Sequence, residues 1–314
     1  MATKILLTVD TELLWRYASG GQAWQDAYAR SYGPADVGVP YQLRQLADHD
    51  LRAVFFVDPM PALHFGIEPI RRMVAPILEA GQSVELHLHP QWSRLVEGKP
   101  TSSFEMIDYP EDEQRALIEQ ACDLLMQAGA PRPIAFRAGS YSANDATLRA
   151  AAGLGLRYDS SHNGADHPWP SAVSLSRDLI APIRHQGITE IPVTLIQDPS
   201  GIRPLQICAV SLREMEAALL HALDRHHPVA TIVSHSFELA ARNSHRPNRI
   251  HTQRFEGLCA FLDQHRAHLP TCSFADLEDV PLDTAATPLP SALFRTWLRQ
   301  AEQLWSNVYE ERSA

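Results

Sequence analysis

Short runs of apolar and β-branched residues alternate along this chain with longer stretches in which apolar residues recur at helical spacing. Residues in the short runs are 4–10, 53–57, 84–89, 134–138, 190–195, 230–235 and, more weakly, 272–274. The helical stretches are 42–48, 68–80, 111–128, 143–154, 211–225 and 249–265. Nearly continuous apolar strands separated by helices are typical of a parallel sheet that is buried on both faces. The pattern therefore predicts an α/β fold, and about seven such units suit a (β/α) barrel better than an open sheet.

The chain of 314 residues is long enough for one large domain or two average ones. We predict one barrel over residues 1–275, with a loop insertion at 13–41 after the first strand. The segment 276–290 is acidic and rich in proline, which is typical of a surface linker. Apolar residues between 293 and 308 recur at helical spacing and predict a C-terminal amphipathic helix, so the second unit is 276–314. We expect this helix to pack on its own barrel, and the alternative is a contact between copies in a homo-oligomer.

The composition narrows the classes of partner. With 37 acidic and 27 basic residues the formal net charge is −10, and nucleic acid binding needs clustered positive charge, so nucleic acid is not an expected partner. No run of 18 apolar residues is present, so we expect no membrane span. The first apolar run is too short for a signal peptide, and the four cysteines are scattered without a CxxC pair. These features predict reduced thiols and a cytoplasmic location.

Polar residues stand at the carboxyl ends of four predicted strands. Because strand side chains alternate, residues two apart share a face of the sheet. Sites in parallel α/β proteins are built at this edge of the sheet. The residues placed there by the sequence are two acids, three histidines and one arginine: Asp10, Glu12, His87, His89, Arg137 and His235.

Each of these residues has an ordinary structural explanation when it is taken alone. A carboxylate at the end of a strand often caps a helix, and a single histidine is usually a surface or core residue. For Arg137, forming an ion pair is a sufficient structural role. The combination of all six on one rim favours a functional site. Carboxylates and neutral imidazoles form the ligand set of a catalytic zinc-like ion, which lowers the pKa of bound water toward ~7. The remaining groups can accept or donate protons, so the sequence predicts metal-assisted hydrolysis.

Five motifs in order along the chain carry a resemblance to a known family. They are Thr-Val-Asp-Thr-Glu at 8–12, Glu-Leu-His-Leu-His-Pro at 85–90, Phe-Arg-Ala-Gly-Ser-Tyr at 136–141, Arg-Tyr-Asp-Ser-Ser at 157–161 and Ile-Val-Ser-His-Ser-Phe at 232–237. Over residues 4–275 the chain resembles the polysaccharide deacetylase family, also called carbohydrate esterase family 4 or the chitooligosaccharide-deacetylase homology domain. The resemblance implies a distorted (β/α) barrel, a divalent metal that is usually zinc, and removal of an N-acetyl group from an amino sugar.

The resemblance also implies roles for individual residues. By position, Asp10 is similar to the family's catalytic base, His87 to its first histidine ligand, Arg137 to the arginine that orients the base, and His235 to the general acid. Two departures affect the expected ligand set. Thr11 stands where the family usually has its ligating acid, so Asp10 and Glu12 are both possible metal ligands. The usual second histidine would fall at position 91, which is Gln91, so His89 is the expected replacement.

The expected substrate is a small carbohydrate or a glycan precursor. Trp15 in the insertion and Trp92 after the His-Leu-His-Pro turn can stack on sugar rings, or can simply pack the loops down. Ser140 and Tyr141 can place a backbone N–H or a hydroxyl at a developing oxyanion. Two alternatives remain at this point. One is a hydrolase of the same fold that cleaves another C–N bond, in a ureide or a cyclic amide. The other is a non-catalytic glycan-binding barrel that has lost its metal.

Overall fold

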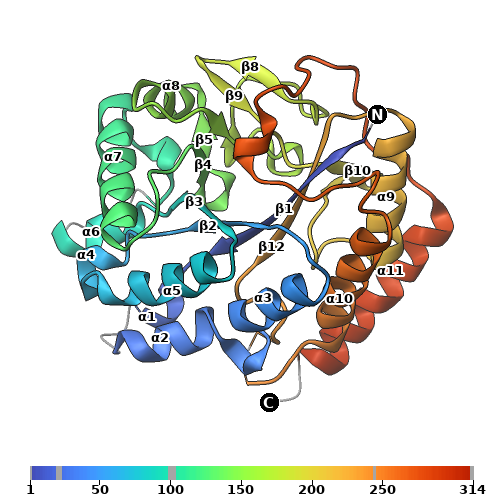
Figure 1. Ribbon diagram of the computed structural model, residues 1–314, viewed down its shortest axis with the longest axis horizontal. Helices are drawn as coiled ribbons and strands as arrows, with labels where there is room; N and C mark the ends of the chain where they lie inside the picture. The colour runs from blue at the N-terminus through green and yellow to red at the C-terminus, as the bar shows by residue number, and fades with distance from the viewer. Residues whose placement is uncertain (1, 19–22, 98–103, 243–244, 312–314) are drawn as a thin grey trace.

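A computed structural model describes residues 2–18, 23–97, 104–242 and 245–311. Its centre is a curled sheet of eight strands in the order β12-β1-β2-β3-β4-β6-β9-β8 (Figure 1). All neighbours in this sheet pair in parallel except β8 and β9, so seven of its strands are parallel. Five of them, β1 to β4 and β12, are strands that the sequence predicted. The strands of this sheet are β1 (Lys4–Thr11), β2 (Val54–Val57), β3 (Ser83–Leu88), β4 (Ala135–Ala138), β6 (Tyr158–Asp159), β8 (Ile183–His185), β9 (Ile188–Glu190) and β12 (Val229–His235).

Irregular backbone, rather than another long strand, continues the sheet beyond β12. The N–H of Thr194 donates to the carbonyl of Thr231 at 3.2 Å, and the N–H of Ile207 donates to the carbonyl of Val233 at 3.1 Å. This is the distortion of the barrel that the resemblance implied. Two short pairs lie outside the main sheet, namely β5 (Ala143–Asn144) with β7 (Ser171–Ala172), and β10 (Leu195–Asp198) with β11 (Gly201–Pro204).

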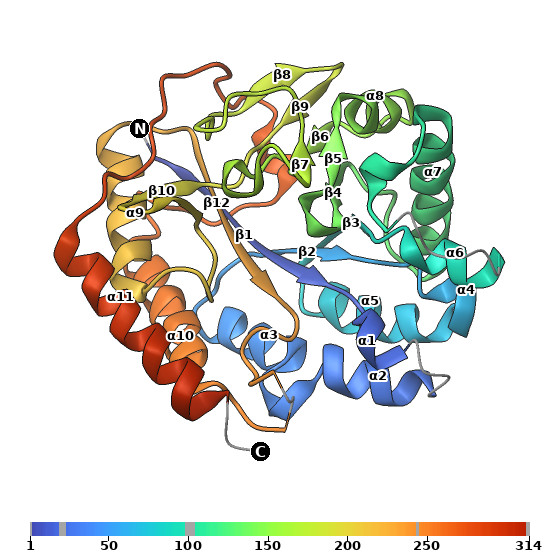
Figure 2. The same ribbon diagram turned by 180° about the vertical axis from the view of Figure 1, so that it is seen from behind.

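Helices surround the outside of the sheet, as the two opposite views show (Figures 1 and 2). The connection between each pair of neighbouring parallel strands from β1 to β4 contains at least one helix, which is the βα arrangement that the sequence pattern predicts. The helices are α1 (Trp15–Ala18), α2 (Trp24–Ser31), α3 (Val39–Asp48), α4 (Ala62–Phe65), α5 (Glu68–Glu79), α6 (Gln91–Glu97), α7 (Glu111–Gln127), α8 (Asp145–Gly153), α9 (Leu212–Asp224), α10 (Arg249–Gln264) and α11 (Leu293–Trp305).

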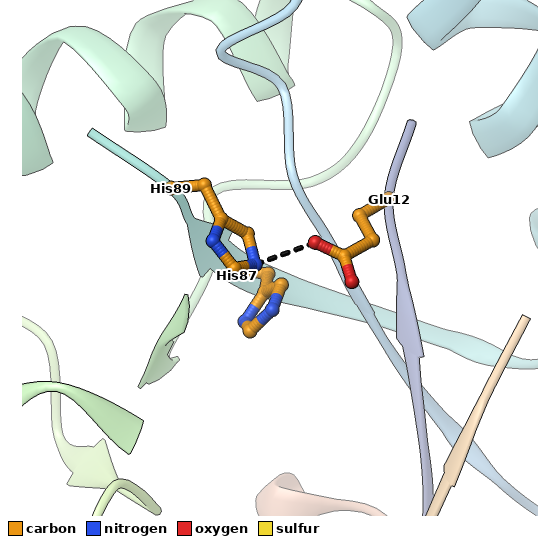
Figure 3. Close-up of side chains that lie close together, drawn as sticks. All are labelled: Glu12, His87 and His89. Carbon is orange, nitrogen blue, oxygen red and sulfur yellow. Dashed lines mark ion pairs between the residues drawn. The ribbon is translucent and has the colours of Figure 1, made fainter. Parts of the chain in front are cut away.

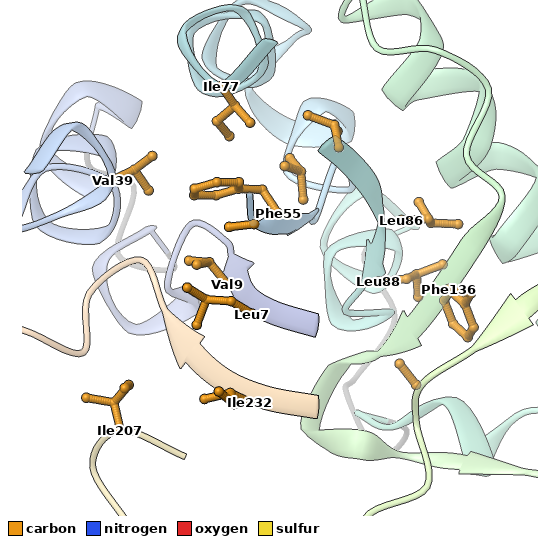
Figure 4. Packing of buried hydrophobic residues seen from close by; sticks show 14 of the residues in the cluster. Leu7, Val9, Val39, Phe55, Ile77, Leu86, Leu88, Phe136, Ile207 and Ile232 are labelled. Carbon is orange, nitrogen blue, oxygen red and sulfur yellow. The ribbon is translucent and has the colours of Figure 1, made fainter. Parts of the chain in front are cut away.

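The two faces of the strands bury different residues. On β1, Leu7 and Val9 point outward and pack with Phe55 and Ile77 between the sheet and its helices (Figure 4). The alternate residue Leu6 lies in a separate inner cluster with Phe56, Phe274 and other apolar residues. This inner cluster fills the part of the barrel near the amino ends of the strands. The polar residues farther along the same strands are therefore left at the carboxyl ends.

Three sequence-based expectations about local structure were wrong. The insertion at 13–41 is largely helical, and its Tyr28 and Tyr32 stack at 4.8 Å with hydroxyls that donate to carbonyls on α5. The run 190–195 is not a strand: β9 ends at Glu190, and Pro192 lacks the N–H that a ladder needs. The segment 272–274 enters a 3₁₀ turn (Phe274–Leu277), and the N–H and hydroxyl of Ser273 at its start donate to the carboxylate of Asp276.

The C-terminal helix α11 also differs from expectation. It packs on the barrel, but with its polar face: Thr296 and Arg299 are buried, whereas Phe294 and Trp297 are exposed. The reason is electrostatic, because the buried Arg299 guanidinium pairs with Asp198 and Glu214 on the body of the protein. A buried arginine with two acidic partners fixes the side of the helix that faces inward.

A buried histidine gives the fold a pH dependence that can be measured. His162 is fully buried, and burial lowers its pKa to about 4, although its Nε2 lies 3.0 Å from the carbonyl of Ser176. The unfolded chain takes up a proton near pH 6.5 and the folded chain only near pH 4, so His162 lowers stability as the pH falls from 7 toward 4. Between pH 7 and 5 we expect His162→Gln to remove about 1–2 kcal/mol of the acid-induced loss. Urea unfolding at both pH values measures this, and parallel losses in both proteins would contradict it.

Candidate metal centre and active site

The sheet register brings the predicted residues to one end of the barrel. In the pairing of β1 with β12, Asp10 is the partner of His235, and in the pairing of β3 with β4, His87 is the partner of Arg137. Glu12 follows the last residue of β1. Segments that are far apart in the sequence therefore converge, as expected for the carboxyl ends of parallel strands.

Glu12, His87 and His89 form a compact cluster (Figure 3). Each offers one ligand atom, and these three atoms lie within 4.8 Å of one another. Among the residues that the structure describes, this is the group of three or more acids, histidines or cysteines that could hold a metal ion. Within the cluster, Nε2 of His89 lies 2.5 Å from Oε2 of Glu12. One carboxylate and two imidazoles are a normal set of protein ligands for catalytic zinc.

The orientation of His87 fits this role. Its Nδ1 lies 2.8 Å from the carbonyl oxygen of Arg137, which can only accept, so Nδ1 carries the proton. Nε2 is then left as the nitrogen with a free lone pair. A backbone carbonyl that fixes the tautomer in this way is the usual partner of a metal-ligating histidine. Burial also lowers the pKa of His87 to about 4, which keeps the ring neutral, as a ligand must be.

The other two cluster residues form a charged pair. Burial opposes charge on both groups, but the mutual attraction and hydrogen bond outweigh it. The pKa of Glu12 falls to about 2, and the pKa of His89 rises to about 9. The carboxylate is thus ionised and ready to act as a ligand, whereas His89 must lose its proton before its Nε2 can bind a cation.

Asp10 lies in a different environment from Glu12. Its Oδ1 accepts a hydrogen bond from Nη1 of Arg137 at 2.7 Å, and both side chains are buried. Arg137 reaches Asp10 across the ring of Phe56, with Cζ 4.3 Å from the ring centroid. Its other donors reach Oγ1 of Thr8 and the carbonyl and hydroxyl of Ser160. The guanidinium is therefore held on all sides, and it fixes Asp10 in place.

His235 lies on the other side of Asp10. Its Nε2 is 3.9 Å from Oδ2 of Asp10, and its Nδ1 is 3.8 Å from Oε2 of Glu238. Burial lowers the pKa of His235, but Glu238 and Asp10 raise it more, to about 9. Glu238 is itself held by Gln206, whose Nε2 donates to Oε1 at 2.8 Å. His235 is therefore protonated at neutral pH and can donate a proton.

The four residues expected to meet the substrate have different surroundings. Ser140 is exposed, and Tyr141 is buried with a hydroxyl that has no partner among the described residues. Both adopt left-handed backbone angles, with φ of 55° and 56°, which is a strained conformation for two consecutive non-glycine residues. Trp92 is buried against Trp15, with ring centroids 4.9 Å apart. Its ring is covered, whereas Trp15 is partly exposed.

Two acidic residues of the site escaped the sequence reasoning. Asp58 directly follows β2, and its Oδ2 is buried without a partner among the described side chains. Burial raises the pKa of Asp58 to about 7, although the nearby His89 lowers it. Its place at the carboxyl end of a predicted strand is the sequence signal that Asp10 and His235 also carry. Glu238 lies three residues after His235 and carried no comparable signal.

A cavity of about 580 Å³ opens beside His235. His235 and Glu238 line it on one side, and Gln303 and Asn307 of the C-terminal segment line it on another. A cavity of this volume is within the range of small-molecule sites.

The ligand assignment predicts a loss of metal in one variant. His87→Ala removes one of the three ligand atoms, so we expect the zinc affinity to fall by more than about a hundredfold, since even changes behind the ligands cost 10–100-fold. Metal content after dialysis, measured by mass spectrometry, tests this. His49→Ala is a matched control, because His49 pairs with Asp263 elsewhere. An unchanged zinc content in His87→Ala would remove His87 from the ligand set.

Comparison with known proteins supports the fold. No protein-family model matches the sequence, and no curated protein matches it. Among solved structures, the chain is similar to a presumed polysaccharide deacetylase from Mycobacterium smegmatis, with 18% identity, a TM-score of 0.53, and coverage of 92% of this chain and 96% of that one. This likeness shows that the chain has the fold of a polysaccharide deacetylase, as the five motifs indicated.

Two further structures give lower scores. A family 4 carbohydrate esterase from Streptomyces lividans, in complex with acetate, has 14% identity and a TM-score of 0.44, covering 92% of this chain and 98% of that chain. A family 4 pseudoenzyme from Bacillus anthracis also has 14% identity and a TM-score of 0.44, covering 93% of this chain and 70% of that chain.

Proposed function

We propose that this protein is a metal-dependent hydrolase that removes an N-acetyl or other N-acyl group from an amino sugar or glycan precursor. One observation carries the proposal: a possible cation site at Glu12, His87 and His89 lies beside a buried Asp10–Arg137 pair, with His235 on the other side of Asp10. The sheet register brings these groups together from β1, β3, β4 and β12. A base, an acid and an electrophile at one site are what amide hydrolysis requires.

The donor set suits zinc, and Glu12, His87 and His89 would hold it. When bound, such an ion supplies a water of lowered pKa and polarises the amide carbonyl. Asp10 has the surroundings of a base: Arg137 holds one carboxylate oxygen, and the other faces His235. His235 carries the proton that the departing amine needs, and Glu238 keeps that imidazole charged.

The fold is that of a polysaccharide deacetylase, and the family that the five motifs resemble acts on carbohydrates. Both favour an amide on a sugar over another kind of amide as the substrate. We propose a small carbohydrate or glycan precursor as substrate, and a cytoplasmic location, since the chain has four free cysteines. Among the described residues, no helix has the length and apolar character that crossing a membrane requires.

The test is a comparison of products from purified, zinc-loaded protein. With N-acetylglucosamine and its short oligomers, we expect acetate release that stops when a chelator removes zinc and returns when zinc is added. Hydantoin and allantoin are the comparison substrates, because ring-opened product from them would favour hydrolysis of a cyclic amide or ureide. Sugar binding with no product and no stoichiometric zinc would instead favour a non-catalytic glycan-binding barrel.

A further inference from the structure

Among the described residues, the largest group of exposed apolar side chains lies on the C-terminal segment. Seven large apolar residues of α11 and of the π-helical turn that follows it (Ser306–Glu310) are between 37% and 81% exposed. The helix lies along the outside of the molecule beside α9 and α10 in both views (Figures 1 and 2). We call these residues the α11 patch: Leu293, Phe294, Trp297, Leu304, Trp305, Val308 and Tyr309.

The helix cannot turn to bury this patch against its own barrel. Its opposite face is fixed by Arg299, which pairs with Asp198 and Glu214, and all three side chains are buried. Farther along, the side chain of Asn248 donates to Oγ of the buried Ser306 at 2.9 Å. Breaking a buried ion pair is strongly unfavourable, so the patch stays on the surface.

The spacing within the patch is that of a seam between helices. Along α11, Phe294, Trp297, Ala301 and Leu304 follow one another at intervals of three, four and three residues. This is the a and d pattern of a heptad repeat, and such a narrow stripe is typically covered by another helix. The small Ala301 in the middle allows a second helix to approach closely.

The area of the patch is large enough for a dimer. Four of its members are aromatic and are 54% to 64% exposed. Since a whole aromatic side chain presents roughly 150–250 Å², these four expose on the order of 500 Å², to which Leu293, Leu304 and Val308 add. The largest apolar patch on a typical monomer is roughly 300–600 Å². A standard protein interface buries about 800 Å² on each partner.

A second copy of the chain fits this surface better than a lipid membrane does. Helices that lie on membranes combine an apolar face with an exposed, basic polar face. In α11 the polar residues Thr296 and Arg299 are instead buried, and the chain has a net charge of −10, which anionic lipid repels. We propose that the α11 patch is the interface of a homodimer in which α11 of one copy packs against α11 of the other around a twofold axis.

The proposed interface is a property separate from the proposed hydrolase activity, but it has a consequence for the site. Gln303 and Asn307 of the same segment line the cavity beside His235. A partner helix packed on the outer face of α11 therefore supports one wall of that cavity.

The test is the mass of the full chain in solution, measured by sedimentation equilibrium over a wide range of concentrations. We expect wild type to have twice the chain mass of 35.0 kDa. The double variant Trp297→Glu/Leu304→Glu places like charges in the seam, and we expect it to be monomeric. Trp169→Glu is the matched control, because Trp169 is equally exposed but lies in the loop before β7, and we expect that variant to stay dimeric.

Three outcomes would overturn the proposal: a monomeric wild type, a double variant that remains dimeric, or wild type that sediments with vesicles of phosphatidylcholine and phosphatidylglycerol while the double variant does not. Near-ultraviolet circular dichroism of the double variant shows whether it has folded. If it has not, cross-linking of Ala301→Cys by a short bismaleimide replaces it, with wild type as control. Covalent dimer from Ala301→Cys alone supports the interface, and its absence contradicts it.

Discussion

Asp10→Asn is expected to lower kcat by about 10²–10⁴-fold while zinc remains bound. The amide cannot accept a proton, but its oxygen can still accept the hydrogen bond from Nη1 of Arg137, so the surrounding geometry should persist. Zinc should stay because Glu12, His87 and His89 form the ligand group without Asp10. Acetate release and metal content, measured on the same preparation, test both halves of this prediction.

Glu85→Gln provides the matched control. Glu85 is also a buried acid on a strand, but its carboxylate accepts the N–H groups of Ile134 and Ala135 at the amino end of β4. Burial raises its pKa to about 7, so an uncharged amide costs little there. We expect this variant to keep its activity. Full activity in Asp10→Asn would exclude Asp10 as the base, and loss of zinc in that variant would make Asp10 a ligand.

The sequence predicted the elements whose pattern is local and strong. The βα alternation located β1 to β4, β12 and most of the long helices, because their apolar faces have clear periods. The strands β6 and β9 have only two and three residues, too few for a period to appear. Their place in the sheet is set by long-range pairing, such as that of Tyr158 with Thr189, which a local pattern does not contain.

The candidate site likewise has a part that the sequence predicts and a part that it does not. The strand-end rule located Asp10, His87, Arg137 and His235, since parallel pairing alone determines which edge they share. It could not decide which acid belongs to the cation cluster, because Glu12 lies beyond the end of β1. The sequence also did not predict which face of α11 packs on the barrel, because the apolar stripe favours burial of the opposite face. The face that packs is decided by Asp198 and Glu214, which lie 101 and 85 residues before Arg299 in the sequence.

Removal of the arginine is expected to produce the largest loss of stability. Arg137→Met leaves the buried Asp10 carboxylate without its partner, and breaking a buried ion pair from one side costs about 3–5 kcal/mol. It also removes positive charge from beside Asp159 and Glu190, two buried acids whose pKa values burial already raises. Unfolding in guanidinium chloride measures the free energy. A loss below about 1 kcal/mol, the value of an exposed pair, would contradict the interaction.

A double-mutant cycle separates the pair from the general cost of each change. In Asp10→Asn/Arg137→Met neither charge is left unpaired, so the double variant should be more stable than the sum of the single losses by about 1–3 kcal/mol. Arg254 is the control: it is buried and pairs with Glu302, and it shares no partner with Asp10. Asp10→Asn and Arg254→Met should therefore be additive. Equal coupling energies in both cycles would mean that the effects on stability are global. A specific stabilising interaction between Asp10 and Arg137 would then be contradicted.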